Sequence, residues 1–154
     1  MTHRTLSLVM VAVVLSALGT LGQVSAQRGP HLRGGGGWGP GGAYGRLYDP
    51  KTIETISGEV VAVELHTPMK GMGGGVHLQL KTDKQTISVH LGPVWYIENQ
   101  DATIEVKDKI EVKGSRVTFD GKPAIIAAEV RKGDQVLKLR DDNGVPHWAG
   151  WRRR

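Results

Sequence analysis

The sequence contains no cysteine, and this absence excludes several classes of protein at once. Without thiols the chain cannot form a disulfide scaffold, a cysteine nucleophile, a Cys-x-x-Cys zinc or redox pair, or a covalent c-type haem. Aromatic residues are also scarce, at 5% of the 154 residues, and Phe119 is the only phenylalanine. The core must therefore be built from Val, Ile, Leu and Ala, a composition that favours strands.

Excess charge is small and lies at one end of the chain. The formal net charge is +5, and without Arg4, which lies in a segment expected to be removed, 19 Lys and Arg face 15 Asp and Glu, or +4. Three of these positive charges are the terminal residues 152–154. A basic tail, unlike a basic domain surface, is weak support for nucleic-acid binding.

The first 26 residues have the pattern of a secretory signal peptide. Arg4 supplies the positive end, residues 6–18 the apolar run, and Val24-Ser25-Ala26 the small-residue cleavage site. We therefore expect a mature chain that begins at Gln27, is exported to the periplasm or secreted, and has no transmembrane span.

Residues 27–47 are expected to form a flexible leader. The stretch from Arg28 to Arg46 holds nine glycines, with Trp38 and Tyr44 among them, and shows no apolar periodicity. Such a composition is typical of linkers. Folding is therefore expected to begin near residue 48 and to end near residue 140, before a tail over residues 141–154.

Apolar residues alternate with polar ones in the folded part, which predicts strands. Three such runs end near Leu65, Leu80 and Leu91, and a proline-led segment at residues 93–97 predicts a short helix. Two further strands, residues 109–118 and 122–130, should form a hairpin at Asp120-Gly121. Residues 135–139 can add a short final strand. The residues expected in the core are Val63, Leu78, Val89, Trp95, Ile110, Val112 and Ile126.

Three strands, a short helix and a hairpin resemble the OB-fold of small exported bacterial proteins of unassigned biochemistry. The resemblance spans about residues 52–130, and Ser57–Val63 and Lys107–Gly114 look like its first strand and its charged turn before the fourth. It implies an all-β fold, a five-stranded Greek-key barrel with one short helix between strands three and four. It also implies a binding module, usually without catalysis, and it carries over no catalytic residue.

No catalytic motif opposes that expectation. The serines lack a Gly-x-Ser-x-Gly context, and Gly73-Gly74-Gly75 is not followed by the Lys-Ser/Thr of a phosphate-binding loop. We therefore expect no enzyme and no required cofactor.

A row of histidines is the most informative feature. A two-residue turn at Asp83-Lys84 would pair Leu78 with Val89 and His77 with His90. Pairing Leu65 with Leu78 would then place His66 opposite His77. The three histidines would lie side by side on the face turned away from the core, with adjacent strands about 4.8 Å apart.

This row is a candidate metal site. Neutral imidazole binds zinc and copper, and the thioethers of Met69 and Met72 in the following loop favour Cu(I). Metal binding is nevertheless the alternative to a preferred reading, in which the outer face of the first three strands and the loop of residues 67–75 bind a small ligand or a protein that the sequence does not identify. The candidate residues are the same in both readings: His66, Met69, Met72, His77 and His90. A further reading is that the histidines and methionines serve packing alone.

The C-terminal tail is a second candidate contact surface. Tryptophans beside arginines suit an anionic membrane surface or a partner groove, although the segment can equally be an ordinary tail; the residues are Trp148, Trp151, Arg152, Arg153 and Arg154. Nucleic acid is the least favoured ligand, because residues 52–91 contain no aromatic side chain on which a base could stack.

Overall fold

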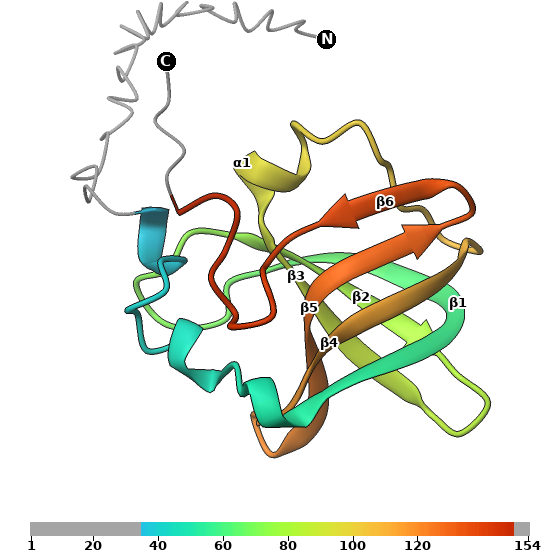
Figure 1. Cartoon of the computed structure of the whole chain (residues 1–154), viewed down its shortest axis with the longest axis horizontal. Helices are drawn as coiled ribbons and strands as arrows, with labels where there is room; N and C mark the ends of the chain where they lie inside the picture. The colour runs from blue at the N-terminus through green and yellow to red at the C-terminus, as the bar shows by residue number, and fades with distance from the viewer. Residues whose placement is uncertain (1–34, 150–154) are drawn as a thin grey trace, which may run out of the picture.

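A computed structural model describes residues 35–149, which form six strands in one sheet and few helical turns (Figure 1). The strands are β1 (Ile53–His66), β2 (Gly75–Lys81), β3 (Thr86–Pro93), β4 (Lys109–Phe119), β5 (Lys122–Lys132) and β6 (Gln135–Lys138). The one α-helix among these described residues is α1 (Val94–Ile97), and the 3-10 turns are η1 (Gly35–Gly37), η2 (Gly45–Leu47) and η3 (Pro50–Thr52). No helix within the described residues is long and apolar enough to span a membrane.

The strand order is β3-β2-β1-β4-β5-β6, and β3 also pairs with β5. The β3–β5 pairing is parallel, while the others are antiparallel. The expected count of five strands is therefore too low, because the chain turns at Gly133 and adds β6 along β5. The expected short helix lies between β3 and β4 as predicted.

Turn chemistry sets two of the registers. The turn at Asp83-Lys84 pairs Leu80 with Ile87 and Leu78 with Val89, as predicted. Asp120 and Gly121 both have positive φ, the conformation that a tight two-residue hairpin turn requires. The hairpin of β4 and β5 therefore closes where the sequence predicts it.

The register between β1 and β2 differs from the prediction by two residues. Leu65 pairs with Val76 and His66 with Gly75, and a bulge lies between Val60 and Ala62. Glycine is needed at position 75 because the Trp38 ring occupies the space that a side chain would fill. Beyond the bulge, a shift of two residues keeps the side chains of residues 62–66 on their predicted faces.

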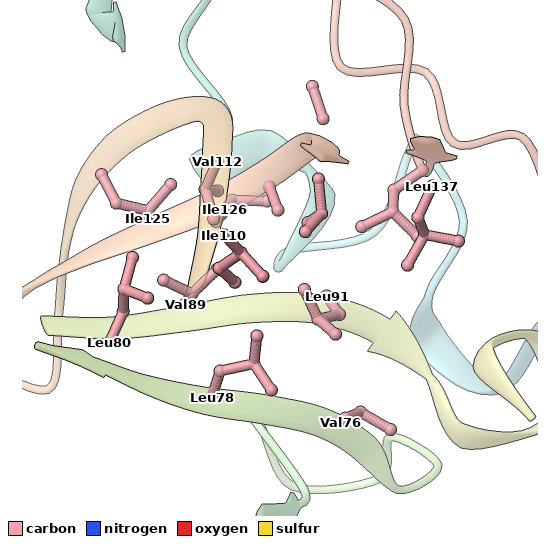
Figure 2. Packing of buried hydrophobic residues seen from close by; sticks show 14 of the residues in the cluster. Val76, Leu78, Leu80, Val89, Leu91, Ile110, Val112, Ile125, Ile126 and Leu137 are labelled. Atoms are coloured by element: carbon pink, nitrogen blue, oxygen red, sulfur yellow. The ribbon is translucent and has the colours of Figure 1, made fainter. Parts of the chain in front are cut away.

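The core lies between β2 and β3 on one side and β4 and β5 on the other (Figure 2). Most of the predicted core residues are buried: Leu78, Val89, Ile110, Val112 and Ile126. Val63 is an exception, with 41% of its surface exposed. Trp95 is half-buried, and its neighbour Tyr96 occupies the interior instead.

Replacing Val89 by alanine tests this assignment of the core. The side chain is fully buried, so we expect a loss of about 2 kcal/mol or more in the free energy of unfolding, from lost burial and the remaining cavity. Urea unfolding of the purified protein measures it. A loss below about 0.5 kcal/mol, the size expected of a surface change, would contradict the burial of Val89.

The glycine-rich leader, as far as the structure describes it, differs from the sequence prediction. Residues 35–52 contain three 3-10 turns, and Trp38 and Tyr44 are each 2% exposed. Gly37 has a φ of 85°, which allows the chain to turn there. Two or three aromatic side chains thus bury enough surface to fix a segment whose composition is that of a linker.

Candidate functional site

The three predicted histidines lie on adjacent strands, His66 on β1, His77 on β2 and His90 on β3. His77 pairs with His90 as predicted, whereas Glu64, and not His66, is the direct partner of His77. The ring centroids of His66 and His77 are 5.0 Å apart, and those of His77 and His90 are 3.8 Å apart and nearly parallel. The structure thus brings the three rings together in a row despite the shifted register.

Two of the three rings are covered. His77 and His90 are 4% and 1% exposed, although they alternate with the core residues Leu78 and Val89 and so face away from the core. The cover over His90 comes from two aromatic rings. The Tyr44 hydroxyl hydrogen-bonds His90 Nδ1 at 2.9 Å, and the Phe119 ring meets His90 edge-on at 4.8 Å.

Burial keeps these two imidazoles neutral. The pKa of His77 is lowered to about 4 by burial and by the neighbouring His66. The pKa of His90 is lowered to about 3 by burial, with further contributions from His77, Arg140 and His66. Neutral imidazole is the form that binds a metal ion, so neither ring needs to lose a proton first at neutral pH.

His77 has an unused nitrogen. Its Nε2 atom is buried and has no hydrogen-bond partner within residues 35–149, an arrangement that is uncommon in folded proteins. The neighbouring His66 is exposed, so its side chain is free to rotate. Within the described residues, however, no group of three or more His, Cys, Asp or Glu side chains is placed to hold a metal ion. In this arrangement His66 and His77 thus have no third ligand of these types in place, and the Glu64 carboxylate, although Glu64 is the direct partner of His77, accepts a hydrogen bond from Gln79 instead.

The methionine loop between β1 and β2 is held in place by the leader. Gly73 N donates to Gly36 O at 2.8 Å, and Trp38 Nε1 donates to Gly73 O at 2.9 Å. Met69 and Met72 are partly buried and pack against the core cluster. Their thioethers thus contribute to packing as the structure stands.

The sequence analysis did not predict an aromatic cluster that joins the two ends of the folded region. The ring centroid of Trp38 lies 5.0 Å from that of Tyr44 and 6.4 Å from that of Trp148. The ring centroids of Trp148 and Tyr96 are 5.1 Å apart. Trp148 Nε1 also donates to Trp38 O at 2.9 Å. In Figure 1 the segment after β6 returns to lie beside the leader. Tryptophan and tyrosine within a glycine-rich stretch were the only signal that could have indicated this contact.

Arg140 is buried beside this cluster. It donates to the carbonyl oxygens of Leu91 and Ala127, and its guanidinium lies 4.7 Å from the centre of the Trp148 ring. Burial lowers its pKa. None of the ion pairs found within residues 35–149 includes it. The aromatic face and the two carbonyl dipoles therefore stabilise this charge in place of a carboxylate.

The tail prediction is wrong for Trp148, which is 4% exposed and therefore has no face free for a membrane or a partner. The segment before it is also folded, because Arg140 pairs with Pro146 in an isolated bridge. Trp151 and residues 152–154 lie outside the described residues, as does the predicted signal peptide.

Comparison with known proteins gives one clear relation. No protein of curated function matches the chain significantly. The profile of the MamS/MamX magnetosome protein family matches residues 52–137, from the start of β1 to β6 and more than half of the chain. The match includes all three histidines and stops before Trp148. The chain therefore belongs to the MamS/MamX magnetosome protein family.

Proposed function

We propose that the protein is an exported, non-enzymatic binding module associated with the magnetosome, with the sheet closed in the manner of an OB-fold. The pairings β1-β2, β2-β3, β3-β5, β5-β4 and β4-β1 form a ring, which is the connectivity of a small closed barrel. Membership of a magnetosome family supports the association, and the signal-like residues 1–26 support export.

The ligand that the site favours is a divalent late transition metal ion held by His66 and His77. The observation that carries this proposal is the buried, unpartnered Nε2 of His77 beside the exposed ring of His66. An ion would satisfy the orphan nitrogen, and imidazole nitrogen suits Zn²⁺ and Cu²⁺. His90 acts as support, because its Nδ1 is engaged by Tyr44 while its ring stacks on His77. Rotation of the exposed His66 side chain is the movement that would admit the ion.

Titration of the purified, metal-free protein with Zn²⁺ and Cu²⁺ by calorimetry tests this proposal. We expect micromolar affinity or better, and at least about a tenfold loss in His66→Ala, because one of two protein ligands is removed. His66 is exposed, so this variant should fold normally.

His147→Ala is the matched control, since His147 is also exposed but lies after β6. It should bind both ions like the unmodified protein. Equal affinity in the His66→Ala variant, or no micromolar affinity in the unmodified protein, would refute the histidine site.

A further inference from the structure

The second half of β1 has a free edge. Residues 53–59 pair with β4 and residues 59–66 pair with β2, so residues 61–66 have a strand on one side alone. The last hydrogen bonds on the other side join Val60 to the turn before β4, where Val60 N donates to Asp108 O and Lys107 N donates to Val60 O. None of the backbone hydrogen bonds within residues 35–149 continues along that side. An edge of this kind is a template for another strand.

The side chains along this edge are divided between two faces. Val63 and Leu65 are 41% and 73% exposed and lie on one face. Glu64 and His66 lie on the other face, and both are exposed. The segment Val61–His66 has no lysine or proline, the residues that commonly protect an edge from pairing. Its exposed apolar residues would be covered by a further strand.

The sequence of the edge is complementary to itself. If two copies pair antiparallel about a two-fold axis at Leu65, Leu65 faces Leu65, and Glu64 of each copy faces His66 of the other. Direct pairing in this register is confined to residues 64–66, because Val63 then lies opposite Thr67, beyond the end of β1. Direct partners lie on the same face of a sheet, at a strand spacing of about 4.8 Å. The neighbouring in-phase register, with Val63 opposite Leu65, would place the two Glu64 carboxylates opposite each other, which is unfavourable.

We propose that two copies of this chain pair along the free edge of β1, and that Glu64 of each copy completes the metal site of His66 and His77 in the other. This inference rests on the proposed function, because it supplies the ligand that a single chain lacks. In a single chain Gln79 Nε2, on β2, donates to Glu64 Oε2 at 3.2 Å, so the carboxylate has to leave this hydrogen bond and turn toward the free edge to reach the other copy. Two imidazoles and one carboxylate form a common zinc ligand set that leaves a fourth position open.

Complementation between two variants tests the shared site. Glu64→Gln keeps both histidines but loses the carboxylate, and His66→Ala keeps the carboxylate but loses an imidazole. Each alone should bind Zn²⁺ at least about tenfold more weakly than the unmodified protein and remain monomeric in sedimentation with Zn²⁺. The unmodified protein should become a dimer when Zn²⁺ is added.

An equimolar mixture of the two variants should regain tight binding. A mixed dimer has one complete site, so the mixture should recover between about a quarter and about a half of the high-affinity Zn²⁺ capacity, according to how far Zn²⁺ favours the mixed pair. Glu59→Gln is the control, because Glu59 is an exposed carboxylate on the same strand where β1 is paired on both sides. This variant should bind and dimerise normally.

The outcomes separate the two proposals. If Glu64→Gln binds Zn²⁺ like the unmodified protein, or the mixture regains nothing, the shared site is refuted while the histidine pair stands. The shared site is refuted in the same way if the unmodified protein binds Zn²⁺ tightly as a monomer. If His66→Ala binds Zn²⁺ normally, the histidine site fails, and the shared site fails with it.

Discussion

Replacing Trp148 by alanine is expected to lower the free energy of unfolding by about 3–5 kcal/mol, the usual cost of removing a buried tryptophan. Three contacts are lost together: the ring against Trp38 and Tyr96, the indole hydrogen bond to Trp38 O, and the aromatic face beneath Arg140. The last loss leaves a buried guanidinium with two carbonyl partners alone. Denaturant unfolding followed by far-UV circular dichroism measures the change.

A milder substitution at the same position and a substitution of an exposed neighbour define the controls. Trp148→Phe keeps an aromatic ring beside Trp38 but lacks the indole N–H, so it should lose less stability than the alanine variant. Val145→Ala changes an exposed residue of the same segment and should alter stability by no more than about 0.5 kcal/mol. A Trp148→Ala variant as stable as the unmodified protein would show that residues 141–149 do not hold the leader.

Acid is expected to destabilise the metal-free protein through the two buried histidines. Their pKa values are about 4 for His77 and about 3 for His90 in the folded chain, against 6.5 for an unperturbed histidine. Below pH 6.5 the unfolded chain therefore binds more protons than the folded chain, so the free energy of unfolding falls as the pH falls from 6.5 toward 4. One pKa unit corresponds to about 1.4 kcal/mol, so the two histidines together should lower the free energy of unfolding by about 6 kcal/mol at pH 4.

The pH dependence of the His90→Asn variant isolates this contribution. Asparagine retains an oxygen that can accept from Tyr44 but does not titrate. The variant should be less stable at pH 7 because it fills less space, yet its stability should change less between pH 7 and pH 4. Urea midpoints measured in the presence of a chelator provide both slopes. Equal slopes in the two proteins would mean that His90 does not contribute to the loss in acid.

Local patterns were sufficient to predict much of the sheet. Alternation identified the buried faces of β2 and β3, and the turns at Asp83-Lys84 and Asp120-Gly121 set the registers that follow them. These features depend on residues close together in the sequence. The pair of His77 and His90 was predictable for the same reason, since a two-residue turn fixes every partner in that hairpin.

The pairing of β1 with β2 depends on features that alternation does not report. A bulge at Val60–Ala62 changes the count of residues along β1, and the eight residues between His66 and Gly75 form no tight turn that could set a register. Val63 and Leu65 follow this bulge and are exposed, although their alternation with polar residues predicted that they would be buried. The histidine row survived because the error was an even number of residues.

Cover over the histidines could not be predicted from local sequence. Tyr44 reaches His90 across 46 positions, and Trp148 reaches Trp38 across 110. A glycine-rich stretch gives no periodic signal, so its aromatic side chains had no indicated partner. This burial changes the candidate site, because only His66 and its neighbours on β1 are exposed where an exposed row of three histidines was predicted.

The hydrogen bond between Trp148 and Trp38 also determines the order in which the molecule can be completed. The chain is synthesised from its N-terminus, so Trp38 is made 110 residues before Trp148. The strands between them can pair in the interval, but the leader gains this contact only after β6 and Trp148 have been made, and contacts so distant in sequence form slowly. During that interval the leader that places Tyr44 against His90 lacks one of its contacts with the folded domain.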